Sequence, residues 1–375
     1  MSLLFITFIP LAYILLRAIL PFVKSLRCRL ALGGVLAAAS FQFPTMLFLA
    51  EPPLLDPELP GWLLILAAWE FAAVWIFFVL LLVADAVRLV VVKLGTSTRR
   101  FDGGITLVLV TVASIIAAIG MVNGKAAPEV HRYTHADREL PRELEGFTIA
   151  LLADLHIGRL DSLEDIEEVV RRTNALHPDV IVIAGDLVSG KIGKIDDKVD
   201  PLAKLRAKCG VFAVPGNHDY YSGWSEWRER FASFGIKMLE NDRRLLPGKL
   251  ALAGITDPDA RWFGEPPPDL DAALRDIPSD HFKLLISHQV KLVREARERG
   301  VDLQLSGHTH GGIILGLDRI VAYKNDGFVA GWYRVGDMAL YVCRGTSQRK
   351  NFPIRLGVPS EIALITLSRG ETGNI

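Results

Sequence analysis

The sequence has few cysteines and no excess of charge of either sign. Its 375 residues include only Cys28, Cys209 and Cys343, with no CxxC pair. An odd count without such a pair argues against a disulfide framework and a cysteine-rich zinc site, although one Cys209–Cys343 bridge stays open. The 42 basic and 42 acidic side chains cancel, and no basic stripe stands out, so charge gives no sign of nucleic-acid binding.

Long hydrophobic runs are what the chain does have, and most of them lie in residues 1–124. Half of all residues are hydrophobic, and the mean hydropathy is +0.30. Each run has about 20 residues, enough for a helix to cross roughly 30 Å of hydrocarbon. We therefore predict an all-α transmembrane domain of about four helices, rather than a cleaved signal peptide at 1–22, which would need a basic N-terminal region. The predicted spans are residues 2–22, 30–50, 61–83 and 104–124.

The charges between these runs predict their orientation. Basic residues gather at loops 23–29 and 94–101, whereas loop 51–60 has three acids and no base. The positive-inside rule places the two basic loops in the cytoplasm, so both termini and everything after residue 124 lie outside. In a bacterium with two membranes, this predicts an inner-membrane protein whose residues after 124 lie in the periplasm. The basic residues are Arg17, Lys24, Arg27, Arg29, Lys93, Arg99 and Arg100.

Three charged residues in or just beyond the third run need a partner. Glu70 falls near the middle of the third run, where an ionisable residue is a functional candidate by default. We prefer the interpretation of a Glu70 side chain hydrogen-bonded between helices. Asp85 and Arg88 lie one helical turn apart, and we expect them to pair with each other.

After residue 124 the sequence changes character twice. Residues 125–146 are polar and interrupted by prolines, which predicts a linker. From 147 to 375, short apolar runs alternate with amphipathic stretches, which predicts an α/β domain. One such stretch, residues 162–176, begins with Ser162 and has Asp165 three residues later, as in a helix with a capping box.

Polar clusters follow the predicted strands of this domain at their carboxyl ends, where open α/β sheets bind ligands. Carboxylate, imidazole and amide oxygen without thiolate suit manganese, iron or zinc better than a structural zinc cage. Because alternate residues of a strand face the same side, we expect each i, i+2 pair to hold an ion together. The clusters are Asp154 with His156, Asp186, Asn217-His218-Asp219, His288, and His308 with His310.

The order DxH…GD…GNHD…SH…GHTH over residues 146–370 resembles that of the calcineurin-like metallophosphoesterases, and the tail after Leu340 resembles their bacterial membrane-anchored branch. The resemblance implies a four-layer α/β/β/α sandwich and two divalent ions. Asp154, His156 and His310 would hold one ion, Asn217, His288 and His308 the other, and Asp186 would bridge both. His218 would face the phosphate and Asp219 would orient it.

The chain departs from the family pattern in three places. Ile313 replaces a glutamine after GHTHGG, Ser189 stands where an acid is frequent, and residues 346–351 replace a glycine-rich segment. None of these changes removes a ligand, so they concern the choice of substrate.

These residues predict a dinuclear-metal phosphoesterase that hydrolyses a phosphomonoester, phosphodiester or pyrophosphate. A hydroxide bridging the two ions would attack phosphorus, and His218 would protonate the leaving oxygen. Arg159, Arg344, Arg349 and Lys350 are candidate phosphate anchors, or else solvated surface charges.

The multi-span anchor and an aromatic cluster favour a lipid-linked substrate, because Tyr and Trp prefer the membrane interface. The alternative is that these aromatic residues pack the domain's own core. A different class of function also stays open, namely a membrane signalling or transport protein whose domain binds a nucleotide or metal without turnover. The sequence leaves the substrate, the metal and the oligomeric state undetermined. The aromatic residues are Tyr220, Tyr221, Trp224, Trp227, Trp262 and Phe263.

Overall fold

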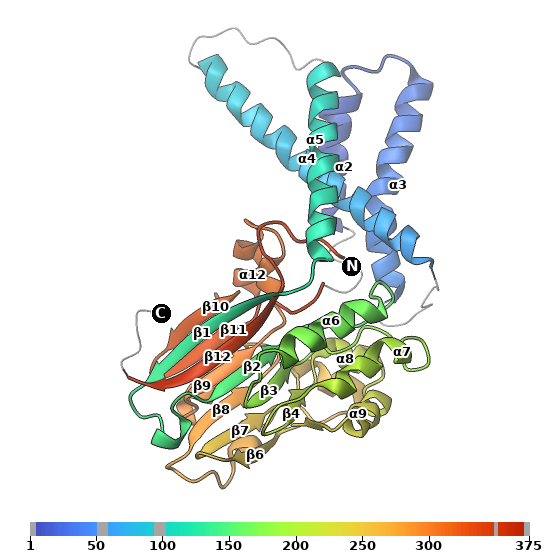
Figure 1. Cartoon of the computed structure of the whole chain (residues 1–375). Helices are drawn as coiled ribbons and strands as arrows, with labels where there is room; N and C mark the ends of the chain where they lie inside the picture. Colours follow the sequence, from blue (N-terminus) through green and yellow to red (C-terminus); the bar gives the residue numbers. More distant parts are fainter. Residues whose placement is uncertain (1–4, 51–58, 94–102, 349–351, 371–375) are drawn as a thin grey trace. The chain divides into compact units, whose positions relative to one another are not determined.

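The computed structural model describes residues 5–50, 59–93, 103–348 and 352–370 (Figure 1). The chain divides into two units, which we name after the sequence predictions: a membrane unit, Met1–Val122 with Asn351–Pro353, and a catalytic unit, Asn123–Lys350 with Ile354–Ile375. The boundary lies two residues before the predicted one at 124. Loops 51–58 and 94–102, whose charges carry the predicted orientation, lie outside the described residues.

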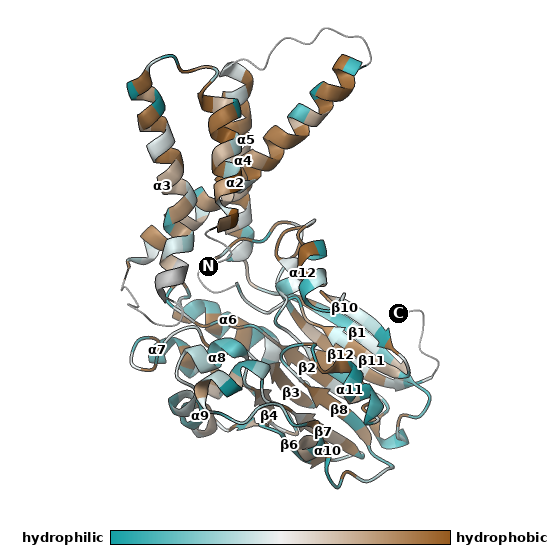
Figure 2. Ribbon diagram, turned by 180° about the vertical axis from the view of Figure 1, so that it is seen from behind, coloured by the Kyte–Doolittle hydropathy of each residue, from teal (hydrophilic) through white to brown (hydrophobic). Residues whose placement is uncertain are grey.

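The membrane unit is helical, and two of its described helices, α4 and α5, are long and apolar enough to cross a bilayer. Figure 2 shows both of them coloured as hydrophobic along most of their length. The elements are α2 Phe8–Ile14, continued by a π-helical turn Leu15–Ile19, then α3 Leu26–Ala50, α4 Gly61–Lys93 and α5 Gly103–Gly124.

The prediction of about four spans is therefore corrected to two candidates among the described residues. The first apolar helix covers only Phe8–Ile19 before the chain turns at Pro21, which cannot continue a helix with its own N–H. Helix α3 is long, but it starts with Arg27 and Arg29 and carries Gln42 and Pro44. Polar residues inside a run lower its mean hydropathy, although its length would suffice.

Charged side chains of the membrane unit have partners on neighbouring helices. Gln42 of α3 donates a hydrogen bond to Glu70 of α4, as the preferred interpretation of Glu70 expects. Asp85 accepts from Arg17 Nε at 2.7 Å and from the Tyr13 hydroxyl at 2.5 Å. The predicted pairing of Asp85 with Arg88 is thus replaced by a pairing with Arg17, far away in sequence.

The catalytic unit is built on two six-stranded sheets (Figure 1). The first runs in the order β1 Glu129–Asp137, β12 Glu361–Arg369, β2 Thr148–Leu152, β3 Val180–Ala184, β4 Val211–Val214 and β5 Ile236–Met238. The second runs in the order β10 Gly331–Val335, β11 Met338–Val342, β9 Leu303–Ser306, β8 Phe282–Ile286, β7 Leu250–Gly254 and β6 Asp242–Leu246.

Alternation along the strands explains how the layers form. In β2, Ala150 and Leu152 face a core beneath the helices, whereas Ile149 and Leu151 face a second core between the sheets. A third core lies on the outer face of the second sheet, against α10 and α11. A strand that is buried on both faces has a continuously apolar sequence, as β3 does. The result is the expected α/β/β/α order of layers.

Short helices connect these strands and cover the outer faces. The capping box at Ser162 and Asp165 is confirmed at the start of α6. The helices are η2 Arg142–Leu144, α6 Leu163–Asn174, α7 Asp196–Val199, η3 Asp200–Lys204, α8 Asn217–Tyr221, α9 Trp224–Ser233, η4 Pro258–Phe263, α10 Leu270–Leu274, α11 Val293–Glu298, η5 His310–Gly312 and α12 Asp318–Lys324.

The segment predicted as a linker, residues 125–146, belongs to the catalytic unit. Nine of its residues form β1, which pairs in parallel with β12 from Glu129 opposite Glu361 to Asp137 opposite Arg369. Its polar sequence fits an edge strand, because a strand with one neighbour buries little of its surface. All three cysteines are free, so the open question of a Cys209–Cys343 bridge is answered in the negative.

Candidate metal centre and active site

The ends of parallel strands bring the predicted ligands together. Strands β2, β3 and β4 are parallel and in register, and so are β7, β8 and β9. The carboxyl ends of each set therefore meet at one edge of its sheet. The first sheet supplies Asp154, His156, Asp186 and Asn217 to this edge, and the second supplies His288, His308 and His310.

The ligand atoms form three groups, and within each group all atoms lie within 4.8 Å of one another. Two of the groups share Asp186. The groups are Asp154, His156 and His310; His156, Asp186 and His218; and Asp186, His288 and His308. The Oδ2 atom of Asp186 lies 3.2 Å from His288 Nε2 and 3.5 Å from His156 Nε2. Asp186 thus stands between two clusters.

Contacts between the other ligands complete the two clusters. His156 Nε2 lies 3.0 Å from His310 Nε2, which is 3.5 Å from Asp154 Oδ1. On the other side, Asn217 Oδ1 lies 3.1 Å from His308 Nδ1 and 3.2 Å from His288 Nε2. All seven predicted ligands are therefore brought together.

The backbone reaches this arrangement by a route that the sequence argument missed. Asp154 and His156 lie beyond the end of β2 rather than within it, and both have positive φ, 53° and 44°. Asp186, His308 and His310 are left-handed too, with φ of 54°, 72° and 51°. Such residues cost free energy and gather where a site over-determines them. Left-handed turns, not strand alternation, aim these side chains.

Two glycines make room for the ligands. A Cβ on Gly216 would lie 2.2 Å from Asp186 Oδ1, and one on Gly185 would lie 2.6 Å from His288 Nδ1. Gly185 also has a φ of 83°. No side chain fits at either position without displacing a ligand, so the glycines of the GD and GNHD motifs are steric requirements of the site.

His218 and Asp219 start helix α8 rather than ending a strand. The His218 backbone N–H donates to Asp186 Oδ1 at 2.8 Å, and its ring centroid lies 4.7 Å from that of His156. The Asp219 carboxylate accepts the backbone N–H groups of Gly216 at 2.8 Å and Val188 at 3.0 Å. Asp219 therefore fixes the turn that presents His218, an indirect way of orienting it.

Two imidazoles are oriented through their second ring nitrogen. His156 Nδ1 lies 2.9 Å from the Ser189 hydroxyl, and His288 Nδ1 lies 2.8 Å from the Ala184 carbonyl oxygen. Each contact leaves Nε2 directed at the cluster. A partner of this kind fixes the ring of a metal-ligating histidine. Ser189, which departs from the family pattern, thus has a defined contact.

The electrostatics of the cluster are those of buried carboxylates among imidazoles. Burial raises the pKa of Asp154 to about 7, and burial together with Asp186 raises that of Asp219 to about 8. Burial opposes the ionised form of Asp186 as well, but His288 and His218 hold its pKa well below the usual range. Burial would lower the pKa of His288, yet the neighbouring Asp186 raises it well above the ordinary value.

The donor set fits two divalent ions. Asp154 and Asp186 are 0% and 2% exposed, and buried charges of this kind are stable when they are paired or coordinate metals. Imidazole, carboxylate and amide oxygen without thiolate exclude a structural zinc cage and suit manganese, iron or zinc.

Of the four candidate phosphate anchors, Arg344 lies beside the cluster. A Cβ on Gly311 would lie 3.2 Å from Arg344 Cγ, and one on Gly345 would lie 3.0 Å from His310 Nδ1. The Arg159 backbone carbonyl accepts a hydrogen bond from Lys198 Nζ at 3.1 Å, and Arg159 has a further interaction. Arg349 and Lys350 lie outside the described residues.

Arg355, near the site, was not found from the sequence, and Tyr221 was singled out only as a member of the aromatic cluster. Arg355 is fully buried and donates to the backbone carbonyls of Arg344 at 3.0 Å and Ser347 at 2.6 Å, so it shapes the loop that carries Arg344. Tyr221 donates to Asp259 at 2.5 Å while its ring lies 5.2 Å from the His218 ring. A lone arginine between apolar residues gives no sequence signal of this role.

The aromatic cluster splits into two parts. Tyr220, Trp224 and Trp227 are at most 3% exposed and belong to the core under the helices, so the core interpretation is correct for them. Trp262 and Phe263 are 71% and 42% exposed.

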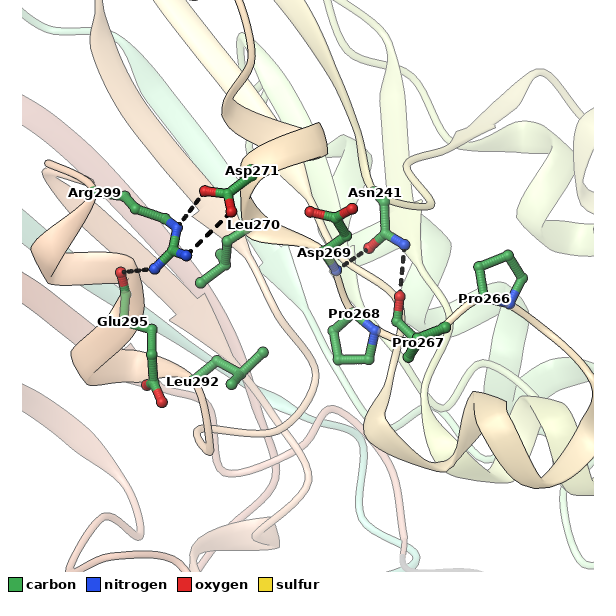
Figure 3. Close-up of a pocket in the computed structure, with 10 residues that line it drawn as sticks. All are labelled: Asn241, Pro266, Pro267, Pro268, Asp269, Leu270, Asp271, Leu292, Glu295 and Arg299. Atoms are coloured by element: carbon green, nitrogen blue, oxygen red, sulfur yellow. Dashed lines mark hydrogen bonds and ion pairs between the residues drawn. The ribbon is translucent and has the colours of Figure 1, made fainter.

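One hollow of the catalytic unit lies away from the metal ligands. It is a groove of about 370 Å³ between the proline-rich stretch 266–268 and α11, and it contains none of the ligands (Figure 3). Its charged groups already have partners: Arg299 pairs with Asp271 at 2.7 Å, and Asn241 contacts Pro267 and Asp269.

Comparison with known proteins agrees with this geometry. The family model of the calcineurin-like phosphoesterases matches residues 147–312. A bovine protein named transmembrane protein with metallophosphoesterase domain is 30% identical over 365 residues, covering 90% of this chain and 80% of its own. Its zebrafish namesake is 32% identical over 276 residues, which is 70% of this chain and 63% of that protein.

A bacterial relative is similar to the same degree. An uncharacterized metallophosphoesterase of Helicobacter pylori is 33% identical over 250 residues, or 66% of either chain. Since vertebrate and bacterial proteins match alike, the expected placement in a bacterial branch is not confirmed. The extent of the bovine match, together with the ligand set, shows that the chain belongs to the calcineurin-like metallophosphoesterase family.

Proposed function

We propose that the protein is a membrane-anchored, dinuclear-metal phosphoesterase. The proposal rests on Asp186, a buried carboxylate that two groups of candidate ligands share. The residues of these two groups come from both sheets. One ion would be held by Asp154, His156 and His310, the other by Asn217, His288 and His308, with Asp186 common to both. When bound, such ions neutralise phosphoryl oxygens and supply a hydroxide nucleophile at neutral pH.

The chain's own residues would do the remaining work. His218 lies within 4.8 Å of the ligand atoms of His156 and Asp186, and we assign it to proton donation to the leaving oxygen rather than to metal binding. Asp219 holds the turn that presents it. Arg344, next to His310, would bind a non-bridging phosphate oxygen through its guanidinium. Arg355 would keep the Arg344 loop in place through its carbonyl contacts.

The test is hydrolysis by the purified full-length chain. It should turn over bis-p-nitrophenyl phosphate in the presence of Mn²⁺ and lose this activity on chelation. A panel of lipid phosphates then asks whether the substrate is lipid-linked. Full activity after complete metal removal would contradict the proposal. Metal binding without any turnover would support the alternative of a signalling or transport protein that only binds.

The predicted side of the membrane needs its own experiment. If α4 and α5 are the spans, residues 125–375 lie on the same side as the start of α4. The basic residues Lys93, Arg99 and Arg100 between the spans then favour an extracytoplasmic catalytic unit. A reporter active only outside the cytoplasm should work when fused after Ile375 and fail after Thr98. The reverse pattern would place the catalytic unit in the cytoplasm.

A further inference from the structure

The stretch that follows the GHTHGG motif exposes an unusual amount of apolar surface. Eight large hydrophobic side chains are exposed among the described residues of the catalytic unit, and four of them lie between Leu315 and Tyr323. Leu315 is 77% exposed, Ile320 60% and Tyr323 91%, with Leu317 at 42%. Single exposed apolar residues are normal, but such a cluster marks an interaction surface.

The stretch is attached directly to the metal cluster. A Cβ on Gly312 would lie 2.8 Å from the Cα of Asp318, at the start of α12, so the helix packs against the loop of His310. The Leu315 backbone N–H donates to the Leu356 carbonyl oxygen at 2.9 Å. The Leu356 N–H in turn donates to the Ile313 carbonyl oxygen at 2.9 Å. Leu356 is the neighbour of Arg355. Whatever contacts residues 315–324 is therefore close to the site.

Gly124 and Lys125 lie beside the loop that follows Arg344, and Arg344 in turn lies against Gly311. Gly124 and Lys125 line a hollow of about 190 Å³ together with Thr346 and Gln348. Thr346 N donates to the Ala153 carbonyl at 2.7 Å, one residue before Asp154. A spanning helix ends at the membrane–water boundary, so Gly124, the last residue of α5, marks that boundary.

The chemistry of the stretch suits a lipid surface. Apolar Leu, Ile and Tyr side chains alternate with the exposed basic residues Arg319 and Lys324. Asp318 is engaged locally, accepting the Gly316 N–H at 2.8 Å. Segments of this composition lie at the headgroup level, where tyrosine prefers the interface and basic side chains attract anionic lipid.

We propose that residues 315–324 contact the bilayer that α5 crosses, with Leu315, Ile320 and Tyr323 in the headgroup region. The metal cluster then opens beside the lipid surface and receives a phosphoester that is held in the membrane. The kind of substrate rests on the proposed function, but the lipid contact itself does not.

The contact is tested on the full chain in lipid nanodiscs of phosphatidylethanolamine and phosphatidylglycerol. In a Cys28→Ser, Cys209→Ala background, Cys343 is buried, so an environment-sensitive dye reports only an added cysteine. The positions are Ile320→Cys and Tyr323→Cys, with Leu245→Cys as control, because Leu245 is 53% exposed on β6 at the far edge of the second sheet.

Doxyl-labelled lipids should quench the dye at 320 and 323 and leave the dye at 245 unchanged. Emission at 320 and 323 that is insensitive to the labelled lipid, or equal quenching at 245, would overturn the proposal. This readout needs no turnover, so a failure of the proposed function would leave it interpretable.

A second experiment tests what the contact does. Two phosphodiesters with the same leaving group are compared, bis-p-nitrophenyl phosphate in water and hexadecyl p-nitrophenyl phosphate in the disc. The Ile320→Asp, Tyr323→Asp variant should lower the ratio of kcat/KM for the lipid-borne to the soluble ester by about a hundredfold, since burial of each of the two side chains is worth about a decade in affinity. Leu245→Asp should leave the ratio unchanged. A wild-type ratio in the double variant would contradict the proposed role.

Discussion

The two sheets of the catalytic unit contribute different chemistry to the same site. The first sheet supplies both carboxylates and the amide, through Asp154, Asp186 and Asn217, whereas the second supplies only imidazoles, His288, His308 and His310. All of the negative charge therefore comes from one sheet. Either ion would need neutral ligands from the other sheet to complete its shell, so the site exists only when the sandwich is closed.

The sheets also differ in how their histidines are held. His156, from the first sheet, is oriented by the Ser189 side chain, and His288, from the second, by the Ala184 backbone. A substitution can remove the first support but not the second. The two halves of the site should therefore respond differently to mutation, and this difference can be tested.

Among residues that are not proposed ligands, the largest effect on rate is expected at His218, in helix α8 after the first sheet's strand β4. His218→Ala should lower kcat by roughly 10²–10⁴-fold, the usual size of a general-acid contribution. The metal content should stay near normal, and the loss should shrink for esters with good leaving groups. His281→Ala, which removes a histidine paired with Asp280 at 3.0 Å, is the control. Loss of metal in His218→Ala would make His218 a ligand instead.

A smaller effect is expected when the support of His156 is removed. Ser189→Ala should weaken metal binding by about 10–100-fold, as losses of such partners usually do. The ion held by Asp154, His156 and His310 should be the one affected. Titration with Mn²⁺ measures the two affinities, and Ser233→Ala, on the exposed face of α9, is the matched control. Equal weakening of both ions would show that the two halves are not independent.

Part of this site could be predicted from the sequence, for a clear physical reason. Parallel strands end at a common edge, so polar residues after successive apolar runs predict a shared site, and Asp186 and His288 are in contact as expected. The left-handed turns at Asp154 and His310 could not be predicted, because only the closed site compensates their strain. Arg355 was missed because its partners are backbone carbonyls, which have no residue-specific signal.

The fold was predictable to a similar degree. Alternating apolar patterns identified the α/β domain, but β1 was missed because its partner β12 lies more than 200 residues further along the chain. The hydropathy of the sequence predicted too many spans, because it depends only on the length and composition of a run. It cannot show that the first helix ends at Ile19. Arg17 pairs with Asp85 across the membrane unit, again a contact that local spacing could not give.

The smallest expected effect concerns a carboxylate of the second sheet that is not a ligand. Asp302 precedes β9, at the end of the strand opposite to the site, and burial raises its pKa to about 6. Because the folded-state pKa is above the unfolded value, ionisation costs stability as pH rises from about 4 to about 6. Asp302→Asn should therefore gain stability relative to wild type over this window, by about 1–2 kcal/mol.

Unfolding of the full chain at pH 4.5 and pH 7.5 measures this difference. The asparagine keeps an oxygen to accept the Lys283 N–H, now 2.6 Å from the carboxylate. Asp280→Asn is the control, since a hydrogen bond from Lys249 lowers the pKa of Asp280. A pH-independent difference for Asp302→Asn would show that the carboxyl group titrates normally.

Counting metal ions in the purified full chain tests most directly the claim that the two sheets hold two ions around one shared carboxylate. Wild-type protein loaded with Mn²⁺ and freed of excess metal should contain two ions per chain. His310→Ala should keep one ion, because the Asn217, His288 and His308 ligands remain, and Asp186→Asn should lose at least one ion together with hydrolysis. Two tightly bound ions in Asp186→Asn, or a single ion in an active wild-type enzyme, would contradict the shared-carboxylate site.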